Sequence, residues 1–130
     1  MGRVYVVNLE GRIYSCKHCQ THLATSDQII SKSFHCRKGR AYLFNEVVNV
    51  STGMKEERLM MTGVHTVSDI FCVVCGSPVG WKYETAYDKA QKYKEGKFIL
   101  ERFGVCGPDG SCYRIRHGAH ISGTTSDTRV

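Results

Sequence analysis

Long apolar runs are absent from this 130-residue sequence, and so is a hydrophobic N-terminal segment. A membrane-spanning helix needs about 20 mainly apolar residues, and a secretory signal needs a short apolar stretch behind a basic start. Gly2 is in place for N-myristoylation, but Val6 stands where that signal has Ser or Thr. We therefore expect a soluble, intracellular chain without membrane contact.

Helical periodicity is also lacking over any stretch of about 12 residues or more. Short runs rich in β-branched and aromatic residues take its place, which is typical of an antiparallel, mainly β domain. The candidate strands are Arg3–Leu9, Ala41–Phe44, Val47–Val50, Arg58–Met61, Val64–Phe71, Val79–Tyr83 and Phe98–Leu100. Glu84–Glu95 is ambiguous between one short helix and a polar hairpin connection, so at most one short helix is expected.

The composition fits one ordinary globular domain, with 42% hydrophobic and 23% charged residues. Lys and Arg exceed Asp and Glu by 18 to 12, and the resulting net charge of +6 permits acidic partners without establishing them. After residue 103, glycines and small polar residues replace the strand pattern. The sequence therefore predicts a folded domain over 1–103 and a flexible tail over 104–130.

Seven cysteines are an odd number, so a fully paired disulfide framework is excluded. Four of them form two Cys-x-x-Cys pairs, Cys16 with Cys19 and Cys72 with Cys75. Each pair can turn both thiolates toward one ion, and two pairs complete a tetrahedron. The spacing predicts one structural Zn²⁺ that holds together two distant parts of the chain and leaves no open coordination position.

Three alternatives to this zinc site are weaker. A four-cysteine iron site has the same spacing, a histidine (His18, His22 or His35) could replace one cysteine, and a redox Cys-x-x-Cys would need a βαβ setting. Gly76 suits the tight turn after the second pair, whereas Gln20 follows the first, so the first turn should be less regular. Cys36 is expected to be a small buried residue. Cys106 and Cys112, either exposed thiols or a pair, receive no role.

A series of segments over about residues 12–102 resembles the Yippee-like proteins, and among them the plant type. These segments are Gly39–Phe44, Val48–Val50, Glu56–Arg58, Thr62–Val67, Ile70–Cys72 with Cys75, Gly80–Glu84 and Gln91–Glu101. The resemblance implies zinc held by Cys16, Cys19, Cys72 and Cys75. It also implies a β-tent, in which two antiparallel sheets lean together and are pinned at the metal. The drug-binding domain of cereblon and the centromere protein Mis18 look like relatives.

The resemblance to cereblon also implies a small pocket, with Trp81 and Tyr83 on one strand face as its walls and His65 as a further candidate. The sequence has only one tryptophan, and a lone Trp in a small β domain is more often a core residue. We therefore favour a core role for Trp81. A small-molecule ligand in this pocket is the alternative.

Three functions follow from these observations. The first is a non-enzymatic zinc-binding module that docks a protein or peptide as an adaptor or scaffold in nuclear or ubiquitin-ligase-type assemblies, with the chain located in the cytoplasm and nucleus. The second is a methionine-R-sulfoxide reductase, because the segment Cys72–Gly80 resembles the second zinc knuckle of those enzymes. Cys112 would be the nucleophile, although the sequence around it does not match the motif of that family. The third is nucleic-acid binding by a stretch in which lysines alternate with aromatic residues, which acidic neighbours dilute. This stretch contains Lys82, Tyr83, Tyr87, Lys89, Lys92, Tyr93, Lys94, Lys97 and Phe98.

Overall fold

The computed structural model describes residues 5–37 and 39–112, and these residues are mainly β. The strands are β1 (Ile13–Cys16), β2 (His22–Thr25), β3 (Ile29–Cys36), β4 (Gly39–Phe44), β5 (Val50–Met60), β6 (Gly63–Cys72), β7 (Pro78–Ala86), β8 (Phe98–Glu101) and β9 (Val105–Cys106). Three short 3₁₀ helices, η1 (Ser26–Gln28), η2 (Lys89–Lys94) and η3 (Arg102–Gly104), connect them. The described residues contain no α-helix.

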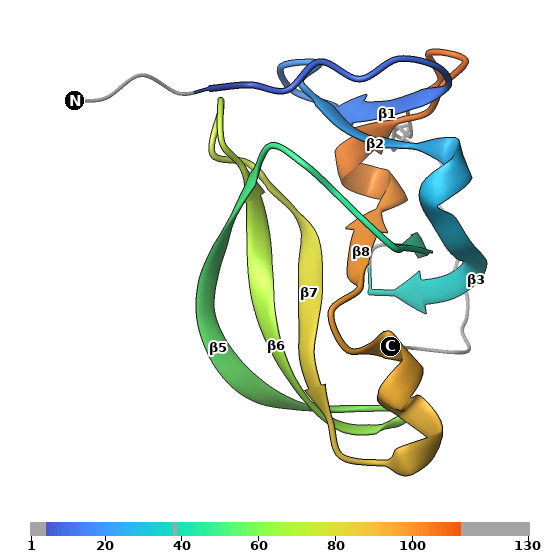
Figure 1. Cartoon of the computed structure of the whole chain (residues 1–130), viewed down its shortest axis with the longest axis vertical. Coiled ribbons are helices and arrows are strands. Elements are labelled where there is room, and N and C mark those ends of the chain that lie inside the picture. Colours follow the sequence, from blue (N-terminus) through green and yellow to red (C-terminus); the bar gives the residue numbers. More distant parts are fainter. Residues whose placement is uncertain (1–4, 38, 113–130) are drawn as a thin grey trace, which may run out of the picture.

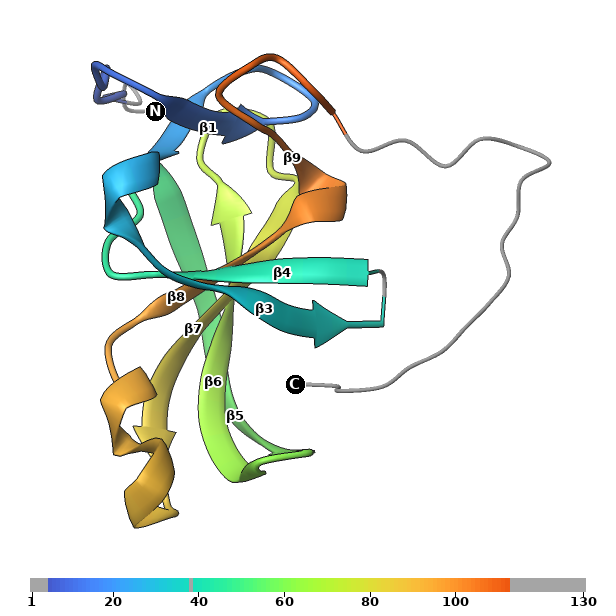
Figure 2. The same cartoon turned by 90° about the vertical axis from the view of Figure 1, so that its right-hand side faces the viewer.

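The strands form two antiparallel sheets (Figure 1). A three-stranded sheet has the order β2-β1-β9, and a six-stranded sheet has the order β3-β4-β8-β7-β6-β5. Figure 2 shows β1 and β9 at one end of the molecule, with the long strands β5, β6 and β7 running away from them. The predicted β-tent of two antiparallel sheets is therefore confirmed.

Two hydrophobic clusters support the sheets. The first lies where the small sheet meets the large one, with Tyr14 and Leu23 packed among Ile70, Val79 and Leu100. Burial of apolar side chains from both sheets is the main favourable contribution to their association. The second cluster contains residues of β4, β6, β7 and β8 within the large sheet. Its buried members are Ala41, Leu43, Val67, Trp81, Tyr83 and Ile99.

Gly80 allows a close approach between β7 and β8 in the large sheet. It pairs with Leu100 across β7 and β8, and a Cβ atom at this position would lie 1.8 Å from the Ile99 carbonyl oxygen. No side chain can be accommodated at that distance without moving backbone. The glycine that precedes Trp81 therefore has a packing reason.

Most predicted strands are present, but two predictions were wrong. Within Arg3–Leu9, the described residues 5–9 form no strand, and the backbone of Val7 and Leu9 bonds to the side chains of Asn49 and His22 rather than to a neighbouring strand. Only Val50 of Val47–Val50 belongs to a strand, the first residue of β5. The ambiguous stretch Glu84–Glu95 contains both the end of β7 and the 3₁₀ helix η2.

The folded region continues past the predicted boundary at residue 103. Val105 and Cys106 form β9, pair with Cys16 and Ser15 of β1, and are buried. A two-residue strand depends on pairing with a distant partner, so no local pattern announces it. The rest of the predicted tail, 113–130, lies outside the described residues.

Candidate metal centre

Two backbone turns of the same construction carry the four cysteines. In the first turn, the Gln20 N–H donates to the Cys16 carbonyl at 2.8 Å, and in the second the Gly76 N–H donates to the Cys72 carbonyl at 2.8 Å. The N–H of the first cysteine in each turn is also bonded, from Cys16 to the Thr21 carbonyl and from Cys72 to the Ser77 carbonyl. Cys16 ends β1 and Cys72 ends β6, so the two turns come from different sheets.

The residue after each cysteine pair adopts a left-handed backbone conformation. Gly76 has φ +79° and Gln20 has φ +64°. The expectation that the first turn would be less regular was wrong, because Gln20 takes the conformation that glycine takes in the second. A side chain in this region costs about 1 kcal/mol or more, so the surrounding hydrogen bonds hold Gln20 there.

The four thiols converge on one point. All four Sγ atoms lie within 4.8 Å of one another, with Cys16 Sγ 3.6 Å from Cys75 Sγ and Cys19 Sγ 3.5 Å from Cys72 Sγ. Sulfurs at about 2.3 Å from a central Zn²⁺ lie about 3.8 Å apart in a regular tetrahedron. The predicted ligand set therefore fits zinc, and four protein ligands leave no position for water or substrate. A four-sulfur iron site would have similar geometry.

A hydroxyl group two residues beyond each pair contacts the second thiol of that pair. Thr21 Oγ1 lies 2.9 Å from Cys19 Sγ, and Ser77 Oγ lies 3.2 Å from Cys75 Sγ. The hydrogen bonds from Ser77 lower the pKa of Cys75 to about 6, whereas burial raises the pKa of Cys16 to about 12. Metal binding requires all four thiolates, and these hydroxyls would stabilise and orient two of them.

None of the three histidines considered as alternative ligands belongs to this cluster in the described part of the chain. His22 instead accepts a hydrogen bond at Nδ1 from the Leu9 N–H, at 3.0 Å.

A family model described as "Yippee zinc-binding/DNA-binding /Mis18, centromere assembly" matches residues 12–108.

The chain belongs to the Yippee-Mis18 family. It is 65% identical over 127 residues to a yippee-like protein of Solanum tuberosum, covering 98% of each chain. It is 60% identical over 90 residues to yippee-like protein 4 of Rattus norvegicus, covering 69% of this chain and 71% of that one. The fold is similar to the crystal structure of the Mis18 "Yippee-like" domain, with TM-score 0.59, 13% identity, and 82% and 98% of the two chains covered. The plant relative matches almost the whole chain, in agreement with the predicted plant type.

The family match ends at residue 108, so the matched region includes β9 of this Yippee-type domain. A disulfide joins Cys106 of β9 to Cys112. The sequence left these two cysteines either exposed or paired, and the structure pairs them.

Among the residues that the structure describes, none of the helices has the length and apolar character that a membrane span requires.

The three predicted pocket residues lie together, but inside the domain. The Tyr83 ring centroid is 5.2 Å from that of His65 and 6.3 Å from that of Trp81. Trp81 is 6% exposed, and the other two are fully buried. His65 Nε2, Trp81 Nε1 and Tyr83 Oη have no well-formed hydrogen bond, and burial raises the pKa of Tyr83 to about 12. The core role favoured for Trp81 agrees with this packing.

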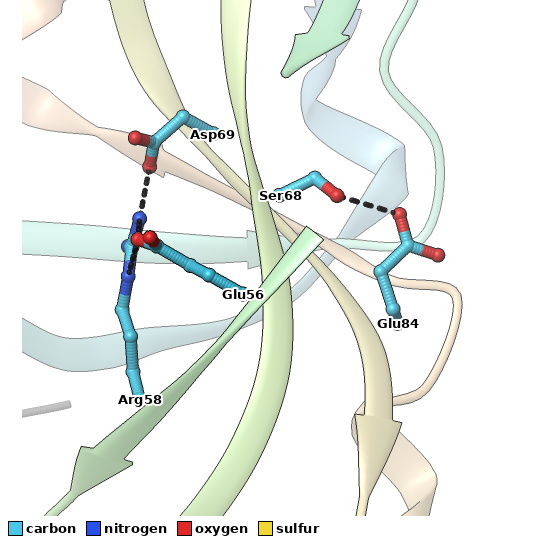
Figure 3. A network of polar contacts seen from close by, with 5 residues as sticks. All are labelled: Glu56, Arg58, Ser68, Asp69 and Glu84. Carbon is cyan, nitrogen blue, oxygen red and sulfur yellow. Dashed lines mark hydrogen bonds and ion pairs between the residues drawn. The ribbon is translucent and has the colours of Figure 1, made fainter. Parts of the chain in front are cut away.

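Trp81 nevertheless lines a cavity of about 470 Å³ at the mouth of the second hydrophobic cluster. Arg58 forms part of the wall, held by Glu56 and by Asp69 at 3.0 Å, while Ser68 and Glu84 bond to each other separately (Figure 3). The lining residues are Cys36, Arg37, Arg58, Leu59, Met60, Trp81 and Glu101. The sequence did not indicate this cavity, because its walls come from four different strands and the β3–β4 turn.

Lys94 differs most from its predicted place. The sequence grouped it with exposed lysines, yet it is only 1% exposed. Its Nζ lies 3.1 Å from Thr62 Oγ1 and within 6 Å of the ring centroids of Phe34, Tyr83 and Tyr93. This lysine is therefore unavailable to a phosphate group.

Proposed function

We propose that the chain is a non-enzymatic protein-interaction module whose fold is stabilised by one structural Zn²⁺. The observation that carries this proposal is the convergence of four cysteine thiols at the junction of two sheets, which would complete the coordination of the metal. A closed four-cysteine site serves folding rather than catalysis. What remains for function is then the surface of the tent.

The methionine-R-sulfoxide reductase alternative needs a reactive thiol near the end of the fold. Cys112 is the candidate, and its sulfur is bonded to Cys106. A thiolate nucleophile must be unpaired and activated by its surroundings. Because an oxidised thiol nucleophile can itself form a disulfide with a second cysteine, it is the mismatched sequence around Cys112, and not the pairing, that favours the non-enzymatic proposal.

The docking surface that we favour surrounds the cavity lined by Trp81. Leu59 and Met61, at the tip of the β5–β6 hairpin, are 82% and 67% exposed. Large apolar residues beside a concavity are typical of interaction sites. A cavity of about 470 Å³ would also hold a small molecule, which is the alternative occupant.

Nucleic-acid binding is supported by the words "DNA-binding" in the description of the family model and by the net charge of +6. It is weakened by the burial of Lys94 and by the ion pair of Lys92 with Glu95 at 3.3 Å. Association with oligonucleotides that falls steeply with salt would favour it over protein docking.

The proposal is tested by a quantitative pull-down from plant cells with the full chain and its Leu59→Ser/Met61→Ser variant. Met54→Ser is the matched control, because Met54 is 88% exposed and shares β5 with Leu59 but lies away from the tip of the hairpin. Zinc content is measured in all three proteins. We expect specific proteins to be lost only from the double variant. Their retention in every variant would move the docking site elsewhere, and the absence of any specific protein would contradict the module.

The same proposal places the chain in the cytoplasm and nucleus. Imaging of the full chain with a small tag tests this location. Exclusion of the tagged chain from the nucleus would restrict the module to cytoplasmic partners.

A further inference from the structure

The side-chain amide of Asn49 binds both backbone groups of one residue near the N-terminus. Its Oδ1 accepts from the Val7 N–H at 2.8 Å, and its Nδ2 donates to the Val7 carbonyl at 2.9 Å. The same Nδ2 donates to the His22 carbonyl at 2.7 Å. A side-chain amide that bonds to both the N–H and the C=O of one residue imitates a neighbouring β-strand. These contacts involve backbone atoms only, so they do not depend on which side chain that residue carries.

A second contact lies two residues further along the same segment. The Leu9 N–H donates to His22 Nδ1 at 3.0 Å. In an extended chain, alternate residues present their backbone groups to the same side. Asn49 and His22 together therefore hold residues 7 and 9 as one side of an extended peptide. Figure 1 shows this N-terminal segment crossing the end of the molecule above the start of β5.

Asn49 is fixed in position by the second cysteine turn. Its backbone has φ +62°, and its carbonyl accepts from the Val73 N–H at 3.0 Å. Asparagine tolerates this left-handed conformation better than most residues. The clamp is thus built on the metal centre, since Val73 follows Cys72 and His22 lies just beyond the first cysteine turn.

Residues 5–9 bury little of their apolar surface where Asn49 and His22 hold them. Tyr5 is 88% exposed, and Val6 and Val7 are exposed as well. Beside Leu9 a cavity of about 170 Å³ remains, with the buried residues Leu23 and Ala24 in its wall. A ligand that filled this space with an apolar side chain would gain burial that residues 5–9 do not achieve.

We propose that Asn49, His22 and this cavity form a groove for an extended segment of a partner protein. That segment would place an apolar side chain where Leu9 now borders the cavity, and residues 5–9 cover the groove until it arrives. The tether gives the covering segment a high effective concentration. Hydrogen bonds that compete with water add little net stability, so a partner that fills the cavity can displace it. This inference rests on the proposed function for the class of partner but uses a different surface from Leu59 and Met61.

The test uses the full zinc-loaded chain and a fluorescent peptide with the sequence of residues 5–11 as the probe. Val7→Pro removes the N–H that Asn49 binds, which weakens the covering segment. Asn49→Gly removes the amide but retains a residue suited to φ +62°. We expect the Val7→Pro chain to bind the peptide about tenfold more tightly than the wild type, and the Val7→Pro/Asn49→Gly chain to lose this gain. A peptide with proline in place of its own valine at position 7 should bind at least several-fold more weakly.

Equal binding by the wild-type and Val7→Pro chains, or binding that survives Asn49→Gly, would overturn the inference. Dimers seen by light scattering in the wild type and lost in Val7→Pro would also overturn it, because the occupant would then be a second copy. If the peptide fails while the Leu59→Ser/Met61→Ser variant still loses its proteins, the proposed function stands and only this groove is wrong.

Discussion

Gln20 and Gly76 occupy equivalent positions in the two cysteine turns and share one left-handed backbone conformation, with φ +64° and +79°. Each donates its N–H to the carbonyl of the first cysteine of its turn at 2.8 Å. The two turns therefore share this backbone conformation and hydrogen bond and carry different side chains at this position. Such a pair allows the conformational strain in one turn to be measured against the other.

Gly76→Ala should lower the free energy of unfolding by about 1 kcal/mol, because a Cβ atom disfavours this backbone conformation. Gln20→Gly should change it by less than about 0.5 kcal/mol, since relief of strain is offset by the greater freedom of glycine in the unfolded chain. Denaturant unfolding of the zinc-loaded variants measures both changes. Equal losses at both positions would mean that backbone strain is not what separates the two turns.

Removal of the metal should unfold the domain. Structural zinc contributes an apparent binding energy of about 10–16 kcal/mol, which equals or exceeds the usual stability of a small domain. Chelation should therefore abolish the near-UV circular dichroism of the chain, and added Zn²⁺ should restore it. A native near-UV spectrum in metal-free protein would contradict a structural role.

The hydroxyl groups beside the thiols should tune metal affinity. Ser77→Ala and Thr21→Val each remove one hydroxyl contact to a thiol while retaining the backbone bonds of the turn. Loss of such a contact typically lowers metal affinity by about 10- to 100-fold. Competition with a chromogenic chelator gives the affinity, and Ser111→Ala, whose hydroxyl bonds to Asp109, is a control that should leave it unchanged.

The ligand set could be predicted because it depends on local spacing. Two Cys-x-x-Cys pairs identify all four cysteines, and Val64–Phe71 and Val79–Tyr83 have the pattern of strands that they form. The conformation of Gln20 could not be predicted, since its own preference opposes the turn. There the tertiary hydrogen bonds decide.

The errors share a cause, which is dependence on distant partners. Val105 and Cys106 form a strand only because β1 offers them an edge, and in the segment 5–9 side chains of Asn49 and His22, rather than a neighbouring strand, bind the backbone of Val7 and Leu9. Lys94 is of a residue type usually found at the surface, yet the rings of Phe34 in β3 and Tyr83 in β7 bury it. No local pattern contains this information.

His65 should make the stability of the fold depend on pH. Burial lowers the pKa of His65, so the folded state binds a proton less readily than the unfolded state, whose His pKa is about 6.5. Above about pH 6.5 the imidazole is neutral in both states, and His65 does not reduce stability. Below that value the unfolded state takes up a proton more readily than the folded state, so the free energy of unfolding should fall with the pH. His65→Gln should show a shallower loss between pH 7.5 and 5.5 in urea unfolding. Zinc content measured in both proteins at each pH separates loss of metal from titration of His65, and identical slopes would contradict the prediction.

Reversing the charge of Lys94 should be far more damaging than reversing that of Lys89, although both lie in η2. A carboxylate at position 94 would be buried against the negative faces of three aromatic rings, beside Thr62 in place of its ammonium partner. We expect Lys94→Glu to cost more than about 3 kcal/mol of unfolding free energy, and Lys89→Glu, at an exposed position, to change it by less than about 0.5 kcal/mol. Thermal unfolding of the two variants, which have the same net charge, separates burial from overall electrostatics. Equal and small effects would mean that the Lys94 side chain is solvated, and the lysine-rich stretch would then regain a cation available for phosphate.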